Sequence, residues 1–473
     1  MVDERALTAQ FEDAADFETR KVLCGGQLLT VLFLDGLTSG GDIAEQVVRP
    51  LAQMTDEARE EVLYTRALQG GVWCASVKEP ESTQQAAELL VNGFCVILFP
   101  GSGKALGCEV KTGEKRSPSP PETENTVKGA KDAFTETLRT NTSLVRRHLR
   151  TPGLRLTETV IGKRTLTKVT VCWIGGLTDP ELPRRMQERL SSIDIDGALS
   201  PAAIEEYVTG SRRTAFPLLE YTERTDHFCQ GLLDGQVGLL ADGLPLGYLA
   251  PVGLGRLMRS PEDRATDFFS ASMLRLLRYA ALGVSLLLPA LYAAMAMFHQ
   301  QMLPTKLLLS IIESKQNVPF STLLEVLGLL CAFELLQQAG LHLPQAIGTA
   351  VSIIGGLVVG TAAVDAKLVS PAALIVTASS GICGFTLPNR ELSDAVRLWR
   401  FVLTVLAGLW GLFGVTVGLL LLLTELAGLE SLGRSYLSPF GRAEVKGALV
   451  RPRLVRQKWR DGALKPMDDQ NQR

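Results

Sequence analysis

Two long uncharged runs in the second half of the chain most constrain how this sequence can fold. They extend from 346 to 364 and from 368 to 388, and each is about as long as the roughly 20 residues that a helix needs to cross a bilayer. Only three residues, including Asp365, separate them. We therefore expect two antiparallel membrane helices joined by a tight turn, with Asp365 at the polar tip near the membrane surface.

The first of these runs carries small residues on one helix face. They recur at every fourth position: Gly348, Ser352, Gly356 and Gly360. Side chains of this size let two helix backbones approach closely, which is a common way for membrane helices to associate. The run therefore predicts a helix-packing face, used either inside one chain or between copies of the chain.

Two further uncharged runs, 279–298 and 401–424, bring the number of predicted full crossings to four. Positive charge favours the cytoplasm for both ends of this region, because Arg275 and Arg278 precede the first span and eight Lys or Arg lie between 434 and 460. The basic tail also predicts contact with membrane lipid. Three arginines would then lie outside, against the positive-inside bias: Arg390, Arg397 and Arg400.

The segment 303–339 is apolar but is interrupted by charges that include Glu325 and Glu334. Nine positions at about 100° each place these two carboxylates on opposite faces of a straight helix. We interpret the segment as one or two re-entrant or interfacial helices with one glutamate directed into the protein or a pore interior; the alternative places both at the water interface. If this segment also crossed, the three arginines would return to the cytoplasm but the basic tail would leave it.

The first half of the chain contains an internal repeat. Residues 28–51 and 168–190 share an apolar β-rich run, a Gly-Leu-Thr turn and an amphipathic helix pattern. Residues 90–107 and 233–247 follow in the same order, each with a strand, a turn containing Gly and a second strand. The predicted fold class is therefore an α/β soluble domain of two repeated subdomains followed by an all-α polytopic membrane domain.

This interpretation divides the chain into five units. They are a first α/β subdomain (1–110), a linker and amphipathic helix (111–159), a second α/β subdomain (160–265), a multi-span helical membrane domain (266–430) and a basic C-terminal tail (431–473). The amphipathic helix carries four arginines beside its apolar face: Arg139, Arg146, Arg147 and Arg150. We interpret them as a solvated face, with lipid headgroups or an acidic partner as the alternative.

No stretch of the sequence carries a recognisable catalytic, cofactor or metal motif. Lys104 follows a glycine-rich turn, but the residue where a phosphate-binding loop needs its first Gly is Leu98. Eight cysteines without Cys-x-x-Cys spacing and only four histidines predict free thiols and no metal site. We expect no enzyme, no cofactor and no nucleic-acid partner. The acidic N-terminus has no apolar core, so we expect neither signal nor transit peptide and place the soluble half in the cytoplasm.

Motifs along nearly the whole chain carry a resemblance to a known family. In the membrane half they are Ala-Val-Ser-Ile-Ile-Gly-Gly (350–356), Val-Ser-Pro-Ala (369–372), Gly-Ile-Cys-Gly-Phe (381–385) and Arg-Leu-Trp-Arg-Phe (397–401). In the soluble half they are Phe-Thr-Glu-Thr-Leu-Arg-Thr-Asn (134–141), Ile-Asp-Ile-Asp-Gly (193–197), Tyr-Thr-Glu-Arg (221–224) and Ser-Pro-Glu-Asp (260–263). The chain resembles the A subunit of the spore germinant receptors of the GerA type.

The resemblance implies a subunit of a nutrient receptor in the spore inner membrane, acting with a transporter-like B subunit, a lipoprotein C subunit and other copies of itself. It implies that activation leads to release of cations and dipicolinate and to germination. We expect an oligomeric ring whose conduction path is lined by 346–388 or by the helix before it, with Glu325, Glu334 and Asp365 as candidate pore carboxylates. The alternatives are an A-type paralogue associated with the dipicolinate channel and a membrane-anchored scaffold without conduction.

Overall fold

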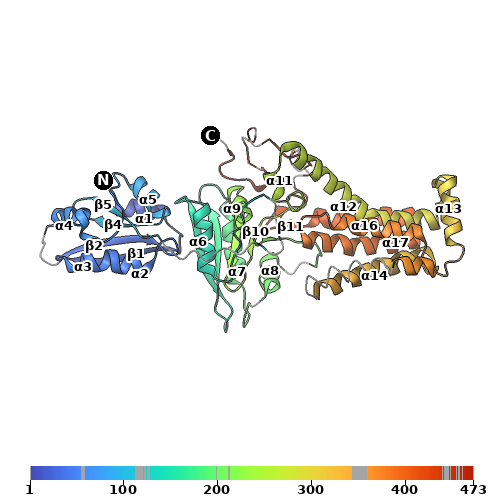
Figure 1. The fold of residues 1–473 in the computed structure, drawn as a ribbon, viewed down its shortest axis with the longest axis horizontal. Coiled ribbons are helices and arrows are strands. Elements are labelled where there is room, and N and C mark those ends of the chain that lie inside the picture. The colour runs from blue at the N-terminus through green and yellow to red at the C-terminus, as the bar shows by residue number, and fades with distance from the viewer. Residues whose placement is uncertain are drawn as a thin grey trace.

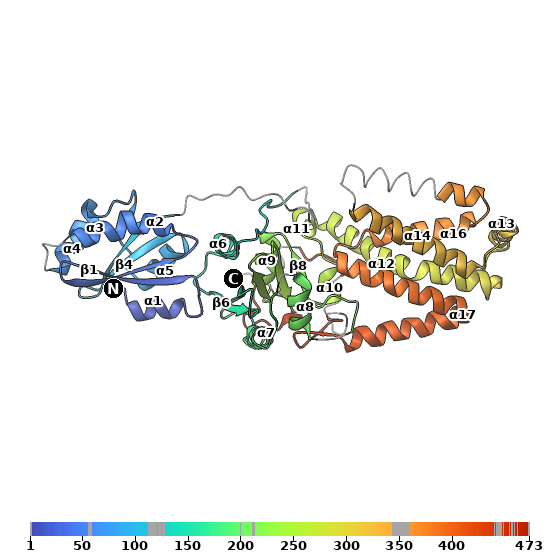
Figure 2. The same ribbon diagram turned by 90° about the horizontal axis from the view of Figure 1, so that it is seen from below.

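The computed structural model describes residues 2–54, 59–111, 121, 124, 128–198, 200–210, 213–342, 360–438 and parts of 440–471. The molecule is elongated, with two β-sheets one after the other and a helical bundle at the end opposite the N-terminus (Figure 1, Figure 2). The C-terminal residues return to the second sheet, where the Met467 N–H donates to the Leu177 carbonyl at 2.8 Å.

The first sheet has five strands in the order β1-β2-β4-β5-β3, and all its neighbouring strands are antiparallel. Val31 and Ile97 face one side of the sheet, whereas the adjacent pair Leu32 and Val96 faces the other. Helices cover both sides, so β4 is buried along its whole length. The strands are β1 (Phe17–Cys24), β2 (Gln27–Leu34), β3 (Val77–Lys78), β4 (Phe94–Phe99) and β5 (Lys104–Glu109).

The helices around this sheet form two layers. On the side of Val31 are α2 (Gly40–Asp42), the π-helix η1 (Ile43–Val48), α3 (Arg49–Gln53), α4 (Glu60–Arg66) and the π-helix η2 (Ala67–Gly71). On the side of Leu32 are α1 (Glu4–Gln10) and α5 (Thr83–Val91).

The second sheet repeats this design with the order β6-β7-β9-β10-β8. The register also repeats, because Thr170 pairs with Leu240 as Thr30 pairs with Leu98 in the first sheet. The two repeated subdomains predicted from the sequence are therefore confirmed in strand order and in cross-strand register. The strands are β6 (Leu154–Ile161), β7 (Thr167–Ile174), β8 (Glu220–Thr222), β9 (Val237–Ala241) and β10 (Gly247–Ala250), and the helices are α6 (Leu138–His148), α7 (Glu181–Ser191), α8 (Pro201–Thr209) and α9 (Thr225–Leu233).

Helix α6 joins the two sheets through its arginines. Arg146 is 1% exposed and forms a bidentate ion pair with Asp16, with both N···O distances 2.7 Å. Arg139 lies 3.0 Å from Asp35 and 3.4 Å from Glu158. The interpretation of these arginines as a solvated face was wrong for Arg146, which is buried against Asp16 of the first subdomain. Arg139 is partly exposed and pairs with one carboxylate from each sheet region.

Three described helices are long and apolar enough to cross a membrane: α12 (Phe268–Met297), α14 (Thr322–His342) and α17 (Arg390–Gly428). They pack with the shorter α16 (Pro371–Gly384), while α13 (Thr305–Lys315) lies across the far end of the bundle (Figure 1). We expected 303–339 to form one or two re-entrant or interfacial helices, but α14 runs along the bundle. Glu325 lies in its first turn and leaves the apolar length that follows uninterrupted up to Glu334.

Helix α17 consists of two antiparallel arms. Gly411 has φ +63° and ψ −142°, which is not a helical conformation, and the chain reverses there. Consequently Gly414 packs directly on the backbone of Leu406, and Gly418 packs on Leu403. The single crossing predicted for 401–424 was therefore wrong, because that run contains the turn between two helices (Figure 2).

The packing clusters show which end of the bundle each helix terminus occupies. Beside the second sheet, Tyr279 at the start of α12 shares a cluster with Leu392 and Leu426, which lie near the two ends of α17. At the far end, Tyr292 of α12 packs with Val326 of α14 and Ala373 of α16. Helices α14 and α16 therefore both run from the far end toward the second sheet (Figure 2).

Candidate functional site

Glu325 connects three helices at the far end of the bundle. Its side chain is fully buried, with 0% exposure, and Lys315 Nζ of α13 lies 3.9 Å from its Oε2. Its Oε1 accepts a hydrogen bond from the backbone N–H of Ser370, the N-cap residue of α16. The positive end of the α16 dipole therefore faces this carboxylate. Glu325 is therefore a buried carboxylate that connects α14 to α13 and to the start of α16.

Glu334, predicted as the second candidate carboxylate, lies closer to the second sheet and contacts a different helix. Its Oε1 lies 3.1 Å from Arg397 Nη1 of α17, and the Glu334 side chain keeps 31% exposure. Arg397 also lies 3.1 Å from Asp394 on its own helix. The structure thus places Glu325 and Glu334 on one helix but directs them to separate partners. We expected the two carboxylates on opposite faces of the helix, and in the structure their basic partners lie on different helices.

Arg400 is a charged residue of the bundle interior whose position sequence reasoning missed. It is 3% exposed, and its Nη1 donates to Ser380 Oγ of α16 at 3.2 Å. Ser380 in turn donates to the Ser285 carbonyl of α12 at 2.7 Å. Among the described residues, Arg400 Nε has no hydrogen-bond partner. The available signal was its spacing of three from Arg397, which puts both on adjacent positions of one helix face.

The remaining candidates lie at the turn before α16. Asp365 is exposed at the end of a short helical segment, residues 360–365. Gly360 packs against Leu374 of α16, since a Cβ at this glycine would lie 3.5 Å from that side chain. The other small residues of the predicted packing face lie outside the described residues: Gly348, Ser352 and Gly356.

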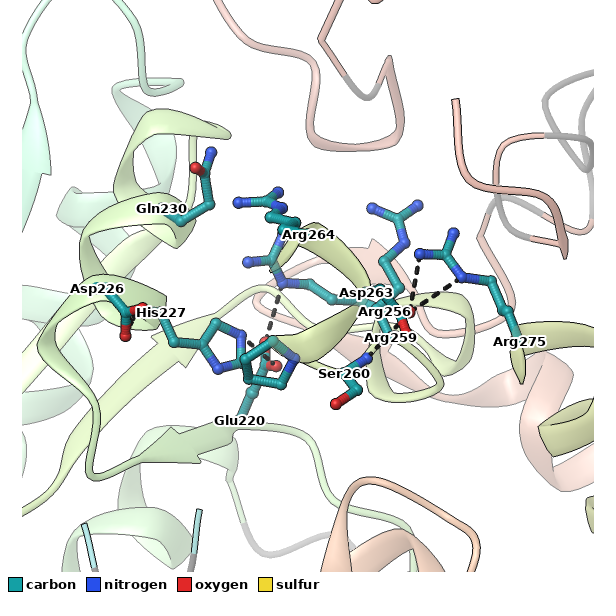
Figure 3. A pocket seen from close by; sticks show the side chains of 11 residues that line it. Glu220, Asp226, His227, Gln230, Arg256, Arg259, Ser260, Asp263, Arg264 and Arg275 are labelled. Atoms are coloured by element: carbon teal, nitrogen blue, oxygen red, sulfur yellow. Dashed lines mark hydrogen bonds and ion pairs between the residues drawn. The ribbon is translucent and has the colours of Figure 1, made fainter. Parts of the chain in front are cut away.

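A cavity of about 190 Å³, which we did not predict from the sequence, lies where the second sheet meets the bundle. Its walls come from β8, α9, α10 (Leu254–Leu257), α11 (Glu262–Ala265) and the start of α12 (Figure 3). We call it the junction pocket. The residues that line it are Glu220, Asp226, His227, Gln230, Arg256, Arg259, Ser260, Pro261, Asp263, Arg264 and Arg275.

Shared ion pairs organise the junction pocket. Arg256 bridges Glu220 at 2.9 Å and Asp234 at 3.0 Å. Burial alone would raise the pKa of Glu220, but the nearby charges of Arg256 and His227 lower it to about 2. Burial likewise opposes ionisation of Asp234, whose pKa is nevertheless lowered by Arg256 and Arg264. Both carboxylates are therefore ionised at neutral pH and hold the arginines in place.

A family model described as Bacillus/Clostridium GerA spore germination protein matches residues 5–466. Uncharacterized membrane protein YfkQ of Bacillus subtilis (strain 168) is 36% identical over 450 residues, covering 94% of this chain and 87% of that protein. Spore germination protein KA of the same organism is 34% identical over 448 residues, covering 93% and 81%. Spore germination protein GerLA of Bacillus cereus is 32% identical over 433 residues, covering 91% and 88%.

A solved structure is also similar: the N-terminal domain of the A subunit of the Bacillus megaterium spore germinant receptor GerK3. It has 23% sequence identity and a TM-score of 0.41, and the match covers 52% of this chain and 92% of that domain. The family match extends over both sheets and the helical bundle. The chain therefore belongs to the GerA family of spore germination proteins.

Proposed function

We propose that the chain is the A subunit of a nutrient germinant receptor in the spore inner membrane. Family membership over residues 5–466 carries this proposal, because it includes the soluble sheets as well as the bundle. In this assembly the partners are a transporter-like B subunit, a lipoprotein C subunit and further copies of the chain. The two sheets and the C-terminal tail lie on the cytoplasmic side.

We further propose that the bundle conducts ions or transmits the activating signal. Support comes from the ion pair of Glu334 with Arg397 and from Arg400 one turn away, since charged groups at membrane depth are costly and usually mark a functional path. Glu334 is the carboxylate with partial access, whereas Glu325 is sealed. Glu334 is thus the candidate for contact with a moving cation, and Glu325 for holding the helices together.

The test is potassium release from spores after nutrient addition, with a strain that lacks the gene as the baseline. Glu334→Gln should change the rate of release several-fold without lowering the amount of protein in the spore membrane, because it removes one charge from the Arg397 pair. Glu313→Gln is the matched control, since Glu313 is exposed on α13. It should leave the rate unchanged.

Two results would contradict the proposal. A null strain that responds normally to every nutrient, with no second receptor present, would remove the receptor function. A normal rate for Glu334→Gln in the presence of normal protein levels would remove this residue from the conduction path and leave the receptor function intact.

A further inference from the structure

Helices α12, α16 and α17 pack against one another in the bundle and are joined by a chain of hydrogen bonds (Figure 2). Pro289 lies inside α12, and because proline has no backbone N–H, the carbonyl of Ser285 loses its donor within the helix. The hydroxyl of Ser380 on α16 donates to that carbonyl at 2.7 Å. Ser380 Oγ in turn accepts a hydrogen bond from Arg400 Nη1 of α17 at 3.2 Å. The proton of Ser380 is therefore directed to α12, and Ser380 serves Arg400 only as an acceptor.

This contact does not neutralise the charge of Arg400. The side chain is buried, and a guanidinium group stays protonated in proteins. Among the described residues Arg400 forms no ion pair and its Nε has no hydrogen-bond partner, because Glu334 of α14 is directed to Arg397. The stretch 343–359, which lies outside the described residues, contains no Asp or Glu. A buried cation that contacts only a neutral hydroxyl is costly, so this position favours a counter-charge from outside the chain.

A second donor without a partner belongs to the same chain of hydrogen bonds. Ser285 is 0% exposed, and within the described part of the chain its hydroxyl forms no hydrogen bond. Helix α16 lies close to this hydroxyl, since a Cβ at Gly384 would be 3.2 Å from Ser285 Oγ. The helices are therefore too close here for a large ligand. A charged N–H and a hydroxyl, both linked to Ser380, are donors suited to a small anion.

We propose that Arg400 and Ser285 bind a small monovalent anion, chloride being the simplest example, between α12, α16 and α17. The anion accepts hydrogen bonds from Arg400 Nε and from the Ser285 hydroxyl, and it supplies the negative charge that Ser380 lacks. It thereby holds the three helices together beside the turn of α12 that contains Pro289. This inference goes beyond the proposed function, since it applies whether the bundle conducts ions or transmits a signal.

The experiment uses the full chain purified in a neutral detergent and compares chloride with gluconate at equal ionic strength. The melting temperature is measured as chloride replaces gluconate, and the line width of the chloride NMR signal reports bound chloride. Chloride should raise the melting temperature until the site is saturated and should broaden the NMR signal. Arg400→Gln should weaken chloride binding at least about ten-fold, because it removes a charged hydrogen-bond donor.

Arg390→Gln is the matched control, because Arg390 is exposed at the start of the same helix. It should bind chloride like the unsubstituted chain, and equal binding by Arg400→Gln and Arg390→Gln would overturn the inference. Ser285→Ala removes the hydroxyl but keeps the carbonyl that Ser380 contacts, and it should weaken binding about five-fold. If Arg400→Gln does not fold, normal chloride binding by Ser285→Ala overturns the inference instead.

The same measurements separate a bound anion from an ordered water molecule. Water at this position would satisfy the two donors in either salt. Equal melting temperatures in chloride and gluconate, without broadening of the chloride signal, would therefore show that the site holds water only and would contradict the anion assignment.

Discussion

Arg146 and Arg400 are both almost fully buried, but their buried charges are compensated by different groups. Arg146 has two hydrogen bonds to one carboxylate, that of Asp16. Among the described residues, the guanidinium group of Arg400 donates a hydrogen bond only to a serine hydroxyl. The first arrangement is a structural link between the two sheets. The second leaves a positive charge available to an anion, a water molecule or a conformational change in the bundle.

Removing one partner of the Arg146 pair should therefore destabilise the soluble part strongly. Asp16→Ala should cost about 3–5 kcal/mol, because it leaves a buried guanidinium without compensation. The measurement is thermal unfolding of the purified chain. Glu45→Ala should cost less than about 1 kcal/mol, since Glu45 and its partner Arg49 are 65% and 60% exposed.

The double variant Asp16→Leu with Arg146→Met completes this test. It should be more stable than Asp16→Ala, because it removes the unpaired charge together with its partner. If Asp16→Ala unfolds at the same temperature as Glu45→Ala, the pair does not link the sheets.

At the scale of elements, the turn at Gly411 decides how the last apolar run is used. Its φ of +63° with ψ of −142° is accessible to glycine and strained for other residues. A Cβ there would also lie 2.8 Å from His299 Cε1 and 3.0 Å from Phe298 Cβ. Gly411→Ala should therefore lower the melting temperature of the detergent-solubilised chain, by an amount that corresponds to about 1–3 kcal/mol from backbone strain alone.

Gly283→Ala is the matched control for this substitution. Gly283 lies inside α12, and a Cβ there would meet nothing within 4 Å. Alanine is the better helix former, so this change should be neutral or stabilising by up to about 1 kcal/mol. Equal melting temperatures for the two variants would show that 401–424 continues as one straight helix.

The sequence predicted the elements with a clear period and missed the reversal. The repeat in the soluble half was found because strand and helix periods recur with matching turns. The spacing of four between Gly414 and Gly418 is typical of close helix packing, but their partners, Leu406 and Leu403, lie in the same run. Hydropathy placed the start of the predicted span at 401 because Asp394, Arg397 and Arg400 lower the hydropathy of the first arm. The turn was not visible because a single glycine between two apolar helices does not interrupt the apolar run.

The candidate site was predictable only in part, because its contacts form between helices that are distant in the sequence. Glu325 and Glu334 stood out as carboxylates in an apolar segment. In the structure Glu325 is buried near Lys315, and Glu334 is partly exposed and lies near Arg397. Their partners come from other helices, so sequence spacing could not identify them. The junction pocket is assembled from five elements. Two motifs of the family resemblance, Tyr-Thr-Glu-Arg (221–224) and Ser-Pro-Glu-Asp (260–263), lie in or beside these elements, but neither indicates a pocket by itself.

At the scale of the whole molecule, the reversal at Gly411 removes the conflict in charge distribution. Among the described residues, α12, α14, α16 and the two arms of α17 run along the bundle. The start of α12, the start of α17 and the residues that follow α17 lie at the same end of it, because Tyr279, Leu392 and Tyr436 share one cluster. Arg390 therefore lies at the end where Arg275 and Arg278 precede the first apolar run, which is the distribution that the positive-inside bias favours. The earlier expectation of four crossings placed Arg390 on the opposite side.

The two arrangements make opposite predictions for cysteine labelling. With Arg390 at the second-sheet end of the bundle and the turn before α16 at the far end, Arg390→Cys should react with a membrane-impermeant maleimide on the same side as Ser191→Cys in the second subdomain, whereas Ala366→Cys should react on the other side. With four crossings both assignments reverse. All three positions are exposed, and the variants are made in a chain whose accessible bundle cysteines, Cys331 and Cys383, are replaced by alanine. Labelling of inverted and right-side-out vesicles in parallel measures the side directly, and reaction of Ala366→Cys on the side of Ser191→Cys would contradict the arrangement with the turn before α16 at the far end.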